Sequence, residues 1–141
     1  MSKTPAGAPT VPITTLVGAM PDHPRAVLYT CHTNTATAAQ ALADLRDVAD
    51  AHRWPVVHEV YDLASPALPR RRRIGWCTLE QLVLRDATNT VIAPAEREIA
   101  WTQSERITLR AWLRGVSGCA LCPQAGFPRA CAPVRPEGRP A

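Results

Sequence analysis

The stretch that decides the fold reads Ala26-Val27-Leu28-Tyr29-Thr30-Cys31-His32-Thr33. It is the earliest run in the chain that is dense enough in apolar and β-branched residues to form a buried strand. Small and hydroxyl-bearing residues follow it, and a helical pattern comes next. Side chains at the carboxyl end of such a strand face a crevice in α/β proteins, so this tip is where we look for chemistry.

The segments after this strand alternate between helical and extended patterns. Apolar residues recur at three- and four-residue steps in three segments that we expect to be helices, Thr35–Arg53, Thr78–Asp86 and Thr102–Gly115. Capping-box pairs mark their starts at Thr37/Gln40, Thr78/Gln81 and Thr102/Glu105. Extended runs predict further strands at Val56–Tyr61, Asn89–Ala93 and Val116–Leu121. This alternation predicts an α/β fold with a mainly parallel, four-stranded sheet flanked by helices on both faces.

Proline-rich segments flank this pattern at both ends. We expect residues 1–24 to be a flexible arm, residues 25–121 to be the folded domain, and residues 122–141 to be a proline-rich tail. About a hundred residues are enough for one hydrophobic core. Aromatic residues make up only 5% of the chain, so this core must be built mainly from Ala, Leu, Val and Ile.

Charge, hydropathy and the number of cysteines indicate which partners and which cellular location to expect. The formal net charge of +4 mildly favours polyanionic partners. No apolar run approaches the ~20 residues that span a bilayer, and no signal-peptide pattern is evident, so no membrane association is expected. The five cysteines are an odd number in a chain that needs no disulfides, which favours a reducing, cytoplasmic location.

Two clusters outside the strand tip invite a functional interpretation. Arg70, Arg71, Arg72 and Arg73 form the densest charge in the chain, either a solvated basic loop or an edge that contacts DNA phosphates. Cys119 and Cys122, with Cys131, suggest zinc, but four ligands are needed and no histidine lies nearby, so we expect free thiols and no metal or cofactor.

Laid out in this way, residues 25–121 resemble the catalytic domain of the serine recombinases, the resolvase and invertase family. That family carries a strand reading Y-x-R-V-S, a second strand ending in D-x-A-S-G, a loop with an arginine, and a third strand leading into L-D-R-L-x-R. The corresponding segments here are Tyr29–Thr33, Asp62–Pro66, Arg72–Gly75 and Ala95–Ala100. The resemblance implies a resolvase-like fold and a phosphate-binding site at the strand tips.

The departures from the family pattern decide the functional prediction. Thr33 stands in place of the serine nucleophile, Cys31 and Ala100 stand in place of arginines, and Glu96 stands in place of an aspartate. Five residues match the pattern: Tyr29, Asp62, Ser65, Arg73 and Arg97. We therefore expect no confident catalytic residue, only a vestigial anion pocket whose candidates are Tyr29, Thr33, Asp62, Ser65, Glu96 and Arg97.

Phosphoryl transfer depends on positioning and on cations that neutralise the phosphate oxygens, and this chain lacks two of them. We expect a degenerate recombinase-like domain that acts as a binding or regulatory module. Its candidate contacts are the DNA backbone, through Arg70–Arg73 and Arg97, or a protein partner or second copy, through the helix Thr102–Gly115. One alternative is a weakly active strand-transfer enzyme with Thr33 as nucleophile. Another is a cysteine-dependent enzyme that uses Cys31, which lies beside His32.

Overall fold

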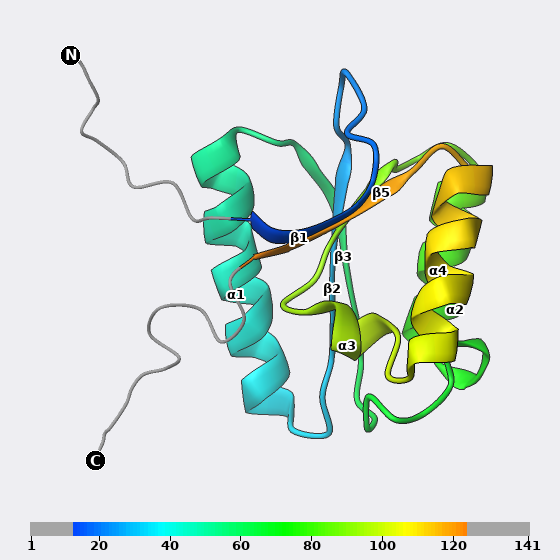
Figure 1. Ribbon diagram of the computed structural model, residues 1–141. Coiled ribbons are helices and arrows are strands. Elements are labelled where there is room, and N and C mark those ends of the chain that lie inside the picture. Colours follow the sequence, from blue (N-terminus) through cyan, green and yellow to red (C-terminus); the bar gives the residue numbers. More distant parts are fainter. Residues whose placement is uncertain (1–12, 124–141) are drawn as a thin grey trace.

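The computed structural model describes residues 13–123 of the chain, in which helices pack on both faces of one sheet (Figure 1). The strands are β1 (Ile13–Gly18), β2 (Ala26–Cys31), β3 (Val56–Asp62), β4 (Thr90–Ile92) and β5 (Cys119–Pro123). The helices are α1 (Thr35–His52), η1 (Arg70–Arg72, a 3-10 turn), α2 (Ile74–Leu84), α3 (Glu96–Ile99) and α4 (Gln103–Gly115).

The sheet has the strand order β1-β5-β4-β2-β3. β2 pairs in parallel with both β3 and β4, and β4 pairs in parallel with β5. Only β1 runs antiparallel, against β5. All six residues of β2 are buried, as expected for a parallel strand covered by helices on both faces. The predicted α/β fold with a mainly parallel sheet is confirmed.

Successive residues of β2 serve two hydrophobic cores. Ala26 and Leu28 pack with the apolar stripe of α1, in which Leu42 and Leu45 are buried. Val27, Tyr29 and Cys31 face the opposite core, which is built with α2 and α4. Figure 1 shows α1 on one side of the sheet and α2 and α4 on the other. The two-residue period of the strand therefore divides the helices between the faces.

The sheet has five strands, not the predicted four. Ile13–Gly18, which we expected within the flexible arm, forms β1 and pairs with β5 along its length. The six residues Ile13–Gly18 are too short a run to stand out beside five nearby prolines. Gly18 ends the strand with φ of +87°, where a Cβ would lie 2.6 Å from the carbonyl oxygen of Gly118. Cys122 and Pro123, which we expected in the tail, belong to β5. Residues 1–12 of the expected arm and 124–141 of the expected tail lie outside the described part.

The start of α1 at Thr35 is as predicted, but its predicted capping pair is wrong, and so is the predicted start of α2; both errors have a physical cause. α1 is capped by Asn34, whose side chain accepts from the Thr37 backbone N–H, so Thr37 lies inside the first turn. α2 begins at Ile74, four residues before the expected Thr78, because its cap is supplied by Asp62 from β3. The predicted capping box of Thr102 and Glu105 is confirmed at the start of α4.

Between residues 13 and 123, no helix combines the length and apolar character needed to cross a membrane.

The start of α2 lies so close to β3 that residue 75 must be glycine. A Cβ on Gly75 would meet the carbonyl oxygen of Tyr61 at 2.4 Å and a carboxylate oxygen of Asp62 at 2.9 Å. We expect Gly75→Ala to lower the free energy of unfolding by about 1–3 kcal/mol in chemical denaturation, because the backbone of α2 must shift away from its cap. Gly115→Ala is the control, since nothing lies within 4 Å of a Cβ there. Equal stability of the two variants would contradict this account.

Candidate active-site crevice

Four polar residues from separate parts of the chain meet at the carboxyl ends of β2 and β3. Tyr29 comes from β2, Asp62 ends β3, Arg73 lies between η1 and α2, and Glu98 belongs to α3. The carboxyl ends of neighbouring parallel strands meet at one edge of a sheet, which is where α/β folds form their crevice. Among the predicted pocket residues, the structure brings Tyr29 and Asp62 together and joins Arg73 to them.

Arg73 is buried to 1% exposure, and its donors are used by the protein itself. Nε donates to the carbonyl oxygen of Leu68 at 2.9 Å, and Nη2 donates to that of Pro66 at 2.6 Å. Nη1 donates to the carbonyl of Glu98 and to the Tyr29 hydroxyl. A guanidinium has five N–H donors, and four hydrogen bonds are made here. The predicted nucleic-acid-binding residue Arg73 therefore directs its guanidinium at groups of the protein itself.

Asp62 acts as a cap for α2. Its Oδ1 accepts from the backbone N–H of Gly75 at 2.7 Å, and its Oδ2 accepts from that of Trp76 at 2.9 Å. Two of the free N–H groups at the helix start are thereby satisfied, and the negative charge faces the positive end of the helix dipole. The Tyr29 hydroxyl donates to Oδ2 at 2.6 Å. The carboxylate of Asp62 is the acceptor in all three of these hydrogen bonds.

The electrostatics of Tyr29 fit a structural role. Burial, and then the hydrogen bond to Asp62, raise the pKa of Tyr29, while Arg73 opposes the shift. The hydroxyl therefore stays protonated and links the carboxylate of Asp62 to the guanidinium of Arg73. The ring packs edge-on against Trp76, with centroids 5.2 Å apart. We call Tyr29, Asp62 and Arg73 the buried polar triad.

Sequence reasoning missed Glu98, which contacts the tip of β2. Its Oε1 accepts from the hydroxyl of Thr30 at 2.8 Å and from the backbone N–H of Cys31 at 3.2 Å, and its Oε2 lies 3.3 Å from His32 Nε2. Burial raises the pKa of Glu98, against the lowering effects of these partners. A signal was present in the sequence: the family motif L-D-R-L-x-R has leucine at the position of Glu98 in the segment Ala95–Ala100.

The other predicted pocket residues do not join the buried polar triad. Thr33 and Ser65 are exposed, and the Ser65 hydroxyl accepts from the backbone N–H of Ala67 at 3.1 Å. Glu96 forms a two-pronged ion pair with Arg110 of α4, with N–O distances of 2.8 and 3.0 Å. Arg97 is exposed and lies over the ring of Trp101, 5.0 Å from its centroid.

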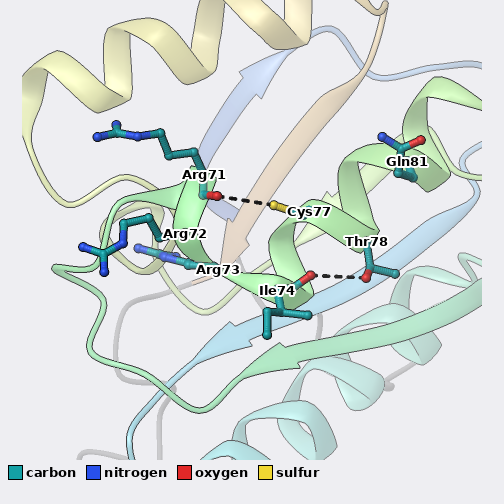
Figure 2. A pocket seen from close by; sticks show the side chains of 7 residues that line it. All are labelled: Arg71, Arg72, Arg73, Ile74, Cys77, Thr78 and Gln81. Carbon is teal, nitrogen blue, oxygen red and sulfur yellow. Dashed lines mark hydrogen bonds between the residues drawn. The ribbon is translucent and has the colours of Figure 1, made fainter.

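The four consecutive arginines have different environments. Arg70 is half-buried over the ring of Trp76, and burial lowers its pKa. Arg71 and Arg72 are exposed, beside a shallow pocket of about 350 Å³ whose other lining residues are Arg73, Ile74, Cys77, Thr78 and Gln81. Figure 2 shows the side chains of Arg71 and Arg72 extending away from Cys77 and Thr78. Of the four, these two present their charge to solvent.

The cysteines of the described residues are free thiols. Cys31 is buried, its Sγ contacts the carbonyl oxygen of Ala64 at 3.3 Å, and burial raises its pKa, which disfavours the nucleophilic thiolate. Cys119 and Cys122 are three residues apart on β5, so their side chains point to opposite faces. Burial raises the pKa of Cys122 to about 12. Residues 13–123 hold no group of three or more His, Cys, Asp or Glu able to bind a metal, and Cys131 lies outside that range.

Comparison with solved structures identifies the fold. The chain is similar to the C-terminal catalytic domain of ISC1926 TnpA, an IS607-like serine recombinase, with 21% identity and a TM-score of 0.56 over 74% of this chain and 69% of that one. It is similar to the N-terminal catalytic domain of TP901-1 integrase, with 18% identity and a TM-score of 0.62 over 70% of this chain and 76% of that one.

A third similar structure is the first open reading frame of transposon ISC1904 from Sulfolobus solfataricus P2, with 14% identity and a TM-score of 0.53 over 70% of this chain and 66% of that one. No family model and no curated protein matches the sequence. These comparisons establish the fold: the described residues fold like the catalytic domains of serine recombinases, the fold that the sequence motifs predicted.

The role of Asp62 can be tested by removing its charge. In Asp62→Asn, an NH2 group replaces one of the two carboxylate oxygens that accept from the three donors. At least one of the three hydrogen bonds is then lost or has its donor and acceptor exchanged. We expect a loss of about 1.5–3 kcal/mol in the free energy of unfolding, measured by chemical denaturation, because hydrogen bonds to a buried charged acceptor are lost. Glu59→Gln on the same strand removes an exposed pair with Arg46 and should cost less than about 1 kcal/mol. A cost for Asp62→Asn no larger than that of this control would show that the cap contributes little.

Proposed function

We propose that this domain is a catalytically inactive relative of the serine recombinase catalytic domains and that it serves as a binding or regulatory module. The observation that carries the proposal is the state of Arg73. Its guanidinium is buried and bonded to three backbone carbonyls and a tyrosine hydroxyl. A cation held in this way is not free to neutralise charge on a reacting phosphate.

The residues around this arginine support the same proposal. Cys31 and Ala100 stand where the resembled family has arginines, and both are buried. Each missing donor costs a phosphoryl-transfer enzyme roughly 10²–10³ in rate, although the losses from residues that act as a unit do not simply add. Thr33, in the place of the nucleophile, is exposed, and the alternative of weak strand transfer depends on its hydroxyl.

Catalytic inactivity predicts that the chain does not cut DNA. We expect supercoiled plasmid incubated with the wild-type chain to show no more nicked or linear product than plasmid incubated with Thr33→Ala. We also expect no covalent protein–DNA adduct on a denaturing gel. Matching melting curves for the two proteins would establish that both are folded. Nicking by the wild type that disappears in Thr33→Ala would favour the strand-transfer enzyme instead.

For the binding role, we propose contact with the DNA backbone through Arg71 and Arg72. Both are exposed and adjacent on η1, and the guanidinium group is well suited to phosphate oxygens. Arg70 and Arg73 have partners within the fold, so the proposal uses only two of the four arginines expected from the sequence. Arg97 is exposed over Trp101 and is a candidate for a further contact.

Salt dependence tests the backbone contact. Replacing both Arg71 and Arg72 by Ala should reduce the slope of log Kobs against log salt for a random duplex by about 2, since each lost phosphate contact removes about 0.9. The matched control is Arg85→Ala with Arg114→Ala, which removes two exposed arginines at the carboxyl ends of α2 and α4. Binding should be measured by fluorescence anisotropy across a salt series.

An equal change of slope in both double variants would show that only overall charge matters. No measurable binding of the wild type at low salt would overturn the DNA contact and leave a protein partner or second copy as the ligand of the module. The outer face of α4 is the candidate surface for that case, because Ile107 is exposed there.

A further inference from the structure

The most exposed large hydrophobic side chain of the described residues is that of Ile74, the first residue of α2. Its exposed fraction is 84%, whereas the next largest values are 61%, for Leu84 and Ile107. Single exposed apolar residues are common on protein surfaces and need no function by themselves. Ile74 differs from the others in how its backbone is held and in which side chains surround it.

The backbone on both sides of Ile74 is anchored to the fold. Arg73, the residue before it, is buried and donates to the carbonyl oxygen of Pro66 at 2.6 Å. Gly75, the residue after it, donates its N–H to Asp62 at 2.7 Å and lies against β3. A backbone rotation that turned the Ile74 side chain toward the core would disturb both anchors. The fold therefore holds an aliphatic side chain in solvent on a rigid support.

Two exposed cations lie beside this side chain. Arg71 and Arg72 of η1 line the same shallow pocket as Ile74, and Thr78 and Gln81 of α2 contribute to its wall (Figure 2). Both arginines are exposed, and no residue of the described part that lines the pocket is acidic. An anionic partner is therefore attracted to the surface from which Ile74 projects.

The composition of this surface fits DNA better than a protein partner. A protein interface has an apolar core from which charged residues are depleted, whereas this pocket places one aliphatic side chain among arginines and uncharged polar groups. Proteins that bind the minor groove of DNA combine the same two elements: arginines are attracted to the negative potential of the groove, and an apolar side chain inserts between base pairs. The minor groove is about 6 Å wide, so one branched aliphatic side chain can enter it.

We propose that Ile74 is an apolar wedge that enters the minor groove of duplex DNA and partly unstacks one base step, while Arg71 and Arg72 contact the backbone beside it. This role rests on the backbone contact proposed above for the two arginines, and it adds the groove and the kind of step that the domain prefers. Pyrimidine–purine steps such as TA unstack most easily. Duplexes that contain TA steps should therefore bind more tightly than duplexes without pyrimidine–purine steps.

The test uses the full chain and a duplex in which 2-aminopurine replaces the adenine of a central TA step, because the fluorescence of this base rises when it unstacks. At saturating protein, the wild type should raise the fluorescence, and Ile74→Ala should lose most of this rise. We expect Ile74→Ala to bind the duplex about threefold to tenfold more weakly, since an apolar contact is lost while the cost of unstacking is recovered. Its slope of log Kobs against log salt should equal that of the wild type, because both arginines remain.

Two further substitutions serve as controls. Ile107→Ala shortens an exposed isoleucine on α4 and should leave the fluorescence rise and the affinity at their wild-type values. Ile74→Leu keeps an aliphatic side chain and should retain most of the rise. Both positions are exposed, so all three variants should give melting curves that match the wild type.

The outcomes separate the wedge from the backbone contact. DNA binding whose salt dependence is set by Arg71 and Arg72, with no change in 2-aminopurine fluorescence, would overturn the wedge and leave the backbone contact standing. The same conclusion would follow from an equal fluorescence rise with the wild type and Ile74→Ala. No binding of the wild type at low salt would overturn both.

Discussion

The arrangement of this domain depends on the hydrogen bonds that satisfy one buried cation. Arg73 bonds to the carbonyl oxygens of Pro66 and Leu68, which lie in the loop after β3, and to that of Glu98 in α3. Its fourth bond is to the Tyr29 hydroxyl, which donates to Asp62. A buried charge is tolerated only when it is paired or fully hydrogen-bonded, so these segments must stay where they are. One side chain thus fixes the loop, α2 and α3 against β2.

Because of the same constraint, the polar side chains of the crevice bond to other groups of the protein. In an enzyme that transfers phosphoryl groups, cations and N–H donors at the strand tips are kept free for the substrate. Here Arg73 donates to backbone carbonyls, Asp62 accepts from N–H groups at the start of α2, and Glu98 accepts from the end of β2. The polar groups that the fold places at this edge of the sheet are therefore used to hold the fold together. Of the four consecutive arginines, Arg71 and Arg72 of η1 keep their charge exposed to solvent.

Local sequence patterns predicted most of the fold. The alternation of extended and helical periods gave the α/β class, and the box of Thr102 and Glu105 located the start of α4, because both ends of that contact lie within four residues. β1 was missed since its pairing partner, β5, is about a hundred residues away. The start of α2 was misplaced for the same reason: its cap is Asp62, on another element.

The candidate site was less predictable than the fold. The motif pieces identified Tyr29, Asp62 and Arg73 as residues that match the family pattern, and the structure joins these three. Sequence could not tell whether Arg73 points toward solvent or toward the loop carbonyls, because that depends on the path of a loop without periodicity. The role of Glu98 depends on where the short strand β4 ends relative to β2, which is a property of the assembled sheet.

The central claim, that Arg73 is held by the fold and not by a ligand, is most directly tested by hydrogen exchange of arginine side chains. Nε–H groups can be followed individually by NMR. Because its Nε–H donates to the Leu68 carbonyl in a buried setting, Arg73 should exchange with solvent far more slowly than the exposed Arg71 and Arg72. Saturating duplex DNA should leave its resonance unmoved. Exchange of Arg73 as fast as that of its two neighbours, or a shift of its resonance when DNA is added, would contradict the account.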